Sequence, residues 1–197
     1  MNGRKEKMAS LAENVYWDEL QAGDWRIYIA CTERGLCYVG TPNDSFETLS
    51  AWVQAKMPQA KLERREEKVA GLKNGLAAYL RGEAADWRCP LDLRGTDFQR
   101  SVWNALMAVR PGETVSYSDI AGQLGRAEAV RAVASAIGAN PALVAVPCHR
   151  IIGKNGALTG YRGGLPMKER LLRLEREGVA ASGAAALAAG DRVAPAR

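Results

Sequence analysis

The sequence predicts an α+β fold in two parts, a small α/β domain over residues 1–93 followed by a helical domain over residues 94–178. The length of 197 residues suits one domain or two small ones. Short runs of aromatic and β-branched residues open the first part, whereas helical spacing dominates the second. The periodicity is broken between them by Pro90, Asp92 and Gly95. Residues 179–197 hold few large apolar side chains and are expected to form a disordered tail.

The first part is predicted to contain a hairpin and two helices. Residues 25–30 and 36–40 have the composition of strands and are separated by a turn-like TERG sequence. Residues 46–56 have helical spacing and follow Ser45, a residue type that favours the N-cap. Residues 61–81 form the second predicted helix, because apolar residues recur along one stripe among charges spaced to pair at i,i+4.

The second part is predicted to contain a helix-turn-helix. A helix over residues 96–109 precedes this motif. Residues 116–119 have the form of a capping box that opens a short helix, which stops near Gly125. A second helix over residues 127–137 follows the tight connection, and it consists almost entirely of small residues with one long cation, Arg131.

Three further elements are predicted beyond this motif. Residues 143–146 have the composition of a buried strand. Residues 151–154 and 157–159 flank an Asn-Gly turn signal, which predicts a tight hairpin. The last helix is expected to start at Pro166 and to stop before Gly178, because proline suits the first turn and glycine the C′ position.

The positive charge of the chain is confined to the second part. Residues 1–93 carry 13 basic and 14 acidic side chains, and residues 94–197 carry 14 and 8, a net charge of −1 against +6. This asymmetry indicates an acidic partner such as nucleic acid, or simply a solvated basic surface, and charge alone leaves both open. No apolar run approaches the ~18 residues that span a membrane, and no secretory signal opens the chain. We therefore expect a cytoplasmic protein with free thiols.

The only histidine of the chain lies beside one of its four cysteines, at Cys148-His149. A free cysteine has a pKa near ~8.5, so a nucleophilic thiol at neutral pH needs a neighbouring base, which His149 can supply. On an extended strand the two side chains would point to opposite sides, so a bridging water or a kink after Pro147 is required. Glu169 on the last helix is the predicted partner of the imidazole. A buried structural cysteine beside an unrelated histidine is the alternative.

The segment Pro147-Cys148-His149-Arg150 (PCHR) resembles the active-site signature of the O6-alkylguanine-DNA alkyltransferases, which include the methylated-DNA–protein-cysteine methyltransferases. The similarity continues through six separated motifs in the family's order, at residues 95–103, 111–117, 129–133, 140–141, 160–164 and 168–169. It implies an RNase H-like N-terminal domain and a DNA repair activity. In that activity Cys148 takes the alkyl group from O6-alkylguanine, and from O4-methylthymine as a further expected substrate, irreversibly and once per molecule.

The resemblance also implies roles for individual residues. His149 is the base that takes the proton of Cys148 through a water, and Glu169 holds its ring. Arg131 fills the space of the base extruded from double-stranded DNA, which is bound through its minor groove. Asn140 ties the helix-turn-helix to the active-site segment. Six further residues are implied to contact the DNA or the base, namely Tyr117, Gln99, Ser118, Lys154, Tyr161 and Arg162. A monomer without a cofactor is implied.

Some relatives in this family hold a structural zinc near the positions of Cys31, Cys37 and Cys89. Structural zinc takes four ligands and no fourth cysteine or histidine lies upstream, so no metal is expected. Two other classes of protein remain open. A helix-turn-helix module or regulator without alkyl transfer is disfavoured because its second helix offers mainly alanine to the DNA bases. A cysteine hydrolase is disfavoured because no oxyanion-hole motif is recognisable.

Overall fold

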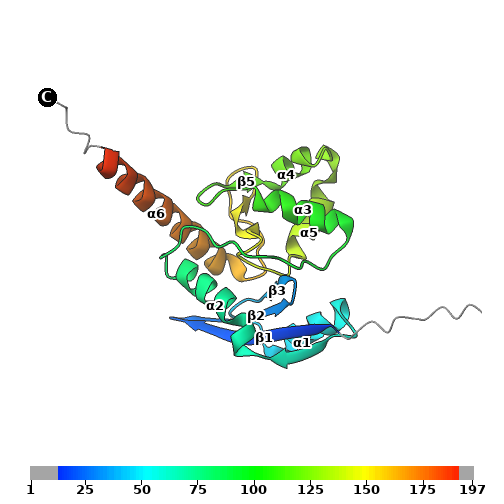
Figure 1. Ribbon diagram of the computed structural model, residues 1–197. Helices are drawn as coiled ribbons and strands as arrows, with labels where there is room; N and C mark the ends of the chain where they lie inside the picture. Colours follow the sequence, from blue (N-terminus) through cyan, green and yellow to red (C-terminus); the bar gives the residue numbers. More distant parts are fainter. Residues whose placement is uncertain (1–12, 191–197) are drawn as a thin grey trace, which may run out of the picture.

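The computed structural model describes residues 13–190 and shows a four-stranded sheet, a cluster of short helices above it, and a long last helix (Figure 1). The strands are β1 (Asn14–Ala22), β2 (Trp25–Thr32), β3 (Gly35–Val39) and β4 (Lys61–Arg64), in the order β3-β2-β1-β4. β4 pairs in parallel with β1, and the other two pairings are antiparallel. Within the described residues, no helix is long and apolar enough to cross a membrane.

The predicted hairpin is confirmed as β2 and β3, but the sequence pattern missed two strands. β1 was not predicted. The prediction of one helix over residues 61–81 is wrong at its start, because residues 61–64 form β4 against residues 14–17 of β1. The second helix, α2, extends over Glu66–Leu80. The charged side chains of β4 suit an edge strand that is exposed to water.

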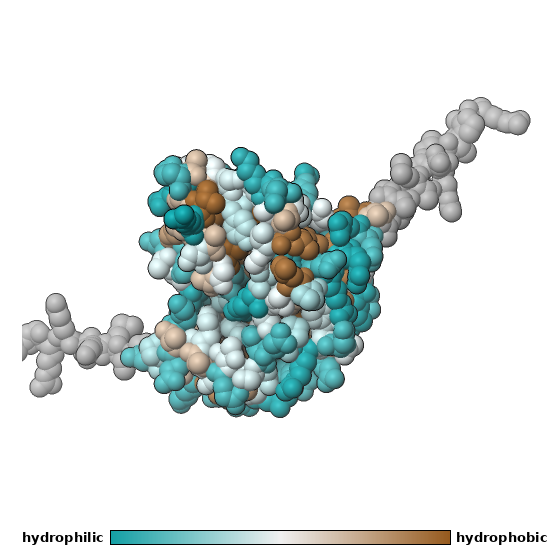
Figure 2. Space-filling view, turned by 180° about the vertical axis from the view of Figure 1, so that it is seen from behind, coloured by the Kyte–Doolittle hydropathy of each residue, from teal (hydrophilic) through white to brown (hydrophobic). Residues whose placement is uncertain are grey.

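Each face of the sheet buries its own set of side chains, because successive residues of a strand point to opposite faces. One face packs on α1 (Phe46–Lys56), which buries Leu49 and Val53 against Tyr28. The other face packs on α2 and on the helical domain in one continuous core, whose members include Ile27, Leu36, Leu76, Trp103, Leu143 and Leu171. The core therefore crosses the predicted domain boundary. Figure 2 shows exposed apolar residues gathered on the upper half of one face, above the largely hydrophilic sheet domain.

The predicted pair of short helices is confirmed in the helical domain. The pair consists of α4 (Tyr117–Gln123) and α5 (Val130–Gly138), joined by a 3-10 turn at Ala127–Ala129. The helix α3 (Asp97–Met107) precedes it. The hydroxyl of Ser116 accepts a hydrogen bond from the backbone N–H of Asp119 at 3.2 Å, as the capping box predicts. Gly125 has a φ of 66°, so the turn between the helices uses a conformation that glycine adopts readily. The Trp103 indole N–H donates to the Ala136 carbonyl at 2.8 Å and joins α3 to α5.

The strand and the hairpin predicted after residue 140 are wrong. Residues 143–146 form a tight turn in which Val144 has a φ of 70°, a strained value for a β-branched residue. An apolar run this short does not distinguish a strand from a buried turn. β6 (Ile151–Ile152) pairs in parallel with β5 (Val115–Ser116), and residues 157–159 form no strand.

The last helix, α6, extends over Gly164–Gly190 and projects from the body of the molecule (Figure 1). The predicted stop before Gly178 is wrong, because the alanine-rich sequence that follows has high helix propensity. The expected disordered tail is therefore wrong over residues 179–190. Its remainder, residues 191–197, lies outside the described part of the chain.

Candidate active site

The Cys148–Arg150 segment forms a single 3-10 turn rather than an extended strand. The backbone N–H of Arg150 donates to the carbonyl of Pro147 at 3.0 Å and closes this turn. All three residues of the turn are buried. The kink after Pro147, one of the two options that the sequence left open, is confirmed, and it directs consecutive side chains to different partners.

The thiol of Cys148 is buried and lies beside Asn140. The side-chain amide of Asn140 donates to Sγ of Cys148 at 3.1 Å and to the carbonyl of Val146 at 2.9 Å. The Asn140 side-chain oxygen accepts from the N–H of Ala142 at 3.0 Å. Burial raises the pKa of the Cys148 thiol, and the hydrogen bond from Asn140 opposes that effect. Because burial prevails, formation of the thiolate requires a base.

His149 has the geometry of that base. Its side chain is fully buried, and Nε2 lies 2.9 Å from Oε1 of Glu175. A carboxylate only accepts hydrogen bonds, so Nε2 carries the proton and Nδ1 keeps its lone pair. Nδ1 is buried without a hydrogen-bond partner among the described residues. Burial lowers the pKa of His149 and outweighs the opposing effect of Glu175, so the ring is neutral and can accept a proton.

Glu175, and not Glu169, is the partner of the histidine. Glu169 is exposed on α6 and no contact with His149 is present, so the prediction of Glu169 is wrong. Six helical residues turn the side chain through about 240° around the axis, which places Glu169 and Glu175 on different faces. A signal for Glu175 was present in the sequence. It continues the apolar stripe of Leu171 and Leu172 at i+4 and i+3, where an acidic residue requires a buried partner.

Arg150 also binds the Glu175 carboxylate and contacts both of its oxygens. Its Nε lies 3.0 Å from Oε2 and its Nη2 2.6 Å from Oε1 of Glu175. The backbone N–H of Gly112 also donates to Oε2, at 3.2 Å. Burial alone would raise the pKa of Glu175, but hydrogen bonds from His149 and Arg150 outweigh it and bring the pKa to about 2. Glu175 is therefore a permanent carboxylate at neutral pH.

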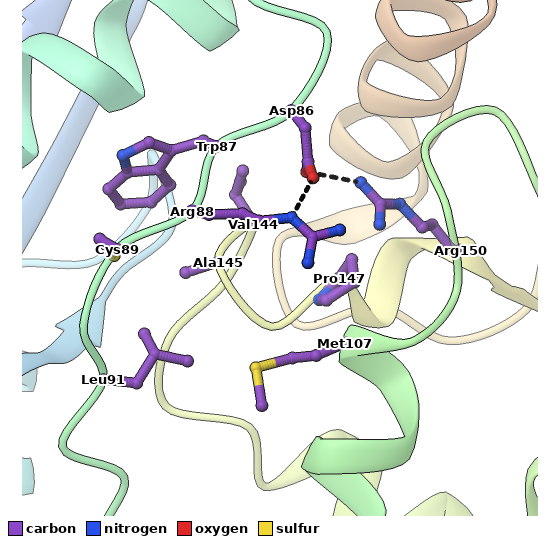
Figure 3. Close-up of a pocket in the computed structure, with 10 residues that line it drawn as sticks. All are labelled: Asp86, Trp87, Arg88, Cys89, Leu91, Met107, Val144, Ala145, Pro147 and Arg150. Atoms are coloured by element: carbon purple, nitrogen blue, oxygen red, sulfur yellow. Dashed lines mark hydrogen bonds and ion pairs between the residues drawn. The ribbon is translucent and has the colours of Figure 1, made fainter.

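One cavity is lined by Pro147 and Arg150 of the active-site turn but not by Cys148 (Figure 3). Asp86 points into it and accepts from Arg88 at 2.7 Å, and it lies 3.5 Å from the guanidinium of Arg150. The cavity is also lined by Cys89. The linker between the two domains therefore contacts the active-site turn through the ion pair of Asp86 with Arg150.

A second cavity, of about 440 Å³, opens onto the thiol and collects several predicted residues. It is lined by Tyr117, Ala134, Ile137, Gly138, Leu143, Cys148, Gly160, Tyr161 and Arg162. The guanidinium of Arg162 donates to the carbonyl of Val39 at 2.8 Å and lies over the Tyr38 ring, so the sheet domain holds it at the rim. The Tyr161 hydroxyl is buried without a hydrogen-bond partner among the described residues. The cavity thus has an apolar wall from α5 and polar groups beside the thiol.

The four remaining predicted residues do not line this cavity. Arg131 is exposed on α5, three residues before Ala134 and therefore on the same helical face. Lys154 is exposed in the loop after β6. The Gln99 side chain accepts from the Thr96 N–H at 3.0 Å and the Ser118 hydroxyl lies 2.7 Å from that of Ser116, so both take part in helix caps.

The other three cysteines are separate thiols. The thiol of Cys31 donates to the Lys68 carbonyl at 3.7 Å and that of Cys37 to the Ala30 carbonyl at 3.4 Å. Burial raises the pKa of Cys89 to about 11. Among the described residues, no group of three or more His, Cys, Asp or Glu side chains could hold a metal ion.

The fold and the site define a helix-turn-helix protein with one buried cysteine arranged for nucleophilic chemistry. Two family models match the chain, described as the ribonuclease-like domain (residues 15–93) and the DNA binding domain (residues 97–177) of 6-O-methylguanine DNA methyltransferase. The chain belongs to the 6-O-methylguanine DNA methyltransferase family. The RNase H-like fold expected for the first domain agrees with the description of its model.

Individual relatives are similar over most of the chain. An inducible methylated-DNA–protein-cysteine methyltransferase of Bacillus subtilis is 47% identical over 82% of this chain and 90% of that protein. A methylated-DNA–protein-cysteine methyltransferase of Mycolicibacterium paratuberculosis is 53% identical over 54% of this chain and 65% of its own length. The crystal structure of Mycobacterium tuberculosis OGT in complex with DNA has a TM-score of 0.68 and 35% identity, covering 84% of this chain and 94% of that one.

Proposed function

We propose that this protein repairs DNA by transferring the alkyl group of O6-alkylguanine to Sγ of Cys148. The proposal rests on one observation. Cys148 lines the cavity of about 440 Å³ beside α5, and the adjacent residue, His149, is paired with Glu175 in the interior. The names of the relatives support the same activity. O6-methylguanine is the expected substrate, with O4-methylthymine as a further one.

The chemistry follows from the protonation states of three side chains. The thiol proton of Cys148 passes through a water to Nδ1 of His149, while Glu175 accepts from Nε2 and stabilises the imidazolium. The thiolate attacks the alkyl carbon, so the S–C bond forms as the C–O6 bond breaks, and the electron pair passes to guanine, which takes up a proton. The product is a thioether, which is a poor leaving group, so each molecule reacts once.

The DNA would bind through its minor groove to the face of the molecule that carries α5. Small side chains on this helix allow its backbone to approach the groove, and Arg131 fills the space of the extruded base. Tyr117 contacts the base and its phosphate, while Gln99, Ser118 and Lys154 contact the DNA backbone. The net charge of +6 over residues 94–197 supports this assignment. We further infer that the protein acts as a cytoplasmic monomer without a cofactor, with functional units over residues 1–93 and 94–178.

The test is the transfer of label from duplex DNA that contains labelled O6-methylguanine. Intact mass and peptide mapping should find one methyl group per protein, on Cys148. Cys148→Ala should accept none, whereas Cys89→Ala, a matched substitution of a partly buried thiol outside the cavity that opens onto Cys148, should accept one. Absence of an adduct on the wild-type protein, or labelling of Cys148→Ala, would overturn the proposal.

A further inference from the structure

A tyrosine of the sheet domain reaches the histidine–glutamate pair of the active site. Tyr79 lies near the end of α2 and is 2% exposed. Its hydroxyl donates to Oε1 of Glu175 at 2.7 Å, and it lies 3.5 Å from Nε2 of His149. The hydroxyl lies 96 residues away from Glu175 in the sequence, so this contact depends on the packing of the two domains.

Oε1 of Glu175 accepts from more donors than it has lone pairs. Tyr79, His149 and Arg150 all contact this one oxygen, at 2.7, 2.9 and 2.6 Å. A carboxylate oxygen has two lone-pair sites, so the three donors share the available negative charge. Each of the other two donors therefore reduces the attraction that Glu175 exerts on the Nε2 proton of His149.

We propose that Tyr79 is a positioning residue for alkyl transfer, whose hydroxyl shares the charge of Glu175 and thereby keeps the His149 ring neutral with Nδ1 free. The inference rests on the proposed role of His149 as the base. It assigns to the sheet domain a part in the reaction that acts through Glu175 and His149, although that domain holds neither the acceptor cysteine nor the helix-turn-helix.

The charges around His149 set the direction of the effect. The groups that face the ring are Tyr79 from α2, Glu175 and Lys168 from α6, Tyr161 from the loop before α6, and Arg150 from its own turn. Burial and the two cations disfavour the imidazolium, and only Glu175 favours it. Loss of the Tyr79 hydroxyl leaves more of the Glu175 charge for the ring, so the pKa of His149 should rise.

The single histidine of the sequence allows a direct measurement that needs no substrate. In protein labelled with ¹⁵N and free of any histidine tag, the two ring nitrogens of His149 report its tautomer and its titration. The wild-type ring should be neutral with the proton on Nε2. In Tyr79→Phe the midpoint should rise by about one pH unit, the scale of one hydrogen bond to a charged group. Tyr28→Phe is the control, because Tyr28 is a buried tyrosine on the opposite face of the sheet.

A second variant covers the case in which Tyr79→Phe does not fold. Site-specific replacement of Tyr79 by 3-fluorotyrosine keeps the ring and the hydroxyl but makes the hydroxyl a stronger donor, so the midpoint should fall. The proposal is overturned if neither variant moves the titration of His149 relative to wild type, or if Tyr28→Phe moves it as far as Tyr79→Phe.

The rate of methyl transfer provides the link to function. In single-turnover reactions as a function of pH, the ratio of wild-type to Tyr79→Phe rate constants should be close to one at pH 8 and should grow toward acid pH, approaching tenfold only below both His149 midpoints. A uniform loss at every pH would indicate a purely structural role and would overturn the assignment. The His149 titration needs no alkyl transfer, so it tests this inference separately from the proposed function. If the protein did not transfer alkyl groups, the midpoint of His149 in Tyr79→Phe would still be shifted.

Discussion

Replacement of Glu175 by glutamine should destabilise the protein strongly, because it removes one partner of a buried ion pair. The Arg150 side chain is 3% exposed, and without Glu175 its nearest carboxylate among the described residues is Asp86, at 3.5 Å. Breaking a buried pair in this way costs about 3–5 kcal/mol. The pKa of Glu175 gives a similar figure, since a fall from 4.5 to about 2 corresponds to about 3 kcal/mol.

The assay is urea and thermal unfolding of Glu175→Gln beside Glu169→Gln, a matched substitution at the exposed glutamate of the same helix. For a chain of this size the buried variant should lose about 6–20 °C in Tm, whereas the exposed one should change by about 0.5 kcal/mol or less. The pKa of Glu175 is depressed, so its contribution is present above pH 4.5 and is lost as the pH falls toward 2. The gap between wild type and Glu175→Gln should narrow over that range. Equal stabilities for wild type and Glu175→Gln at pH 7 would refute the reasoning.

Three further predictions concern single residues. Arg131→Ala should reduce alkyl transfer from duplex DNA far more than transfer from a free O6-alkylguanine base, and equal losses on both substrates would remove its role in base extrusion. Asn140→Ala should raise the pKa of the Cys148 thiol, which thiol alkylation rates against pH would detect, and should cost about 1–3 kcal/mol by leaving the buried Ala142 N–H without the Asn140 oxygen that accepts from it. Gly35→Ala should cost about 1–3 kcal/mol in urea unfolding, because its φ is 143° and an added Cβ would lie 2.4 Å from the Pro90 carbonyl oxygen; an unchanged midpoint would contradict this.

The elements that the sequence predicted well are those whose signals are local. The β2–β3 hairpin is defined by two apolar runs around a short turn, and the cap at Ser116 by a residue three positions away. β1 forms a tight hairpin with β2, with Ala22 opposite Trp25, and it was missed because the buried Asp18 interrupts its alternation of apolar and polar residues. β4 was missed because it pairs with residues 14–17 of β1, which lie far away in the sequence. Pairing partners so far apart leave no mark within a short window of sequence.

The site shows the same limit. Cys148, His149 and Asn140 were found through adjacency and a contiguous motif, and the structure brings all three together. The prediction of Glu169 is wrong because it rested on helical position without the direction of the buried stripe, on which Glu175 lies. Tyr79 was not predicted at all, because its partners lie on the other domain and nothing in the local sequence distinguishes it from an ordinary core tyrosine.

The continuous hydrophobic core has a consequence for how the protein unfolds. Because side chains of the sheet, of α3 and of α6 belong to one cluster, neither domain can open without exposing the apolar surface of the other. Unfolding should therefore be a single cooperative event, and cleavage in the linker should not release an active helical fragment. A destabilising substitution in the strands should therefore inactivate the thiol, just as a substitution beside Cys148 would. We expect substitutions that reduce activity to be distributed over both domains.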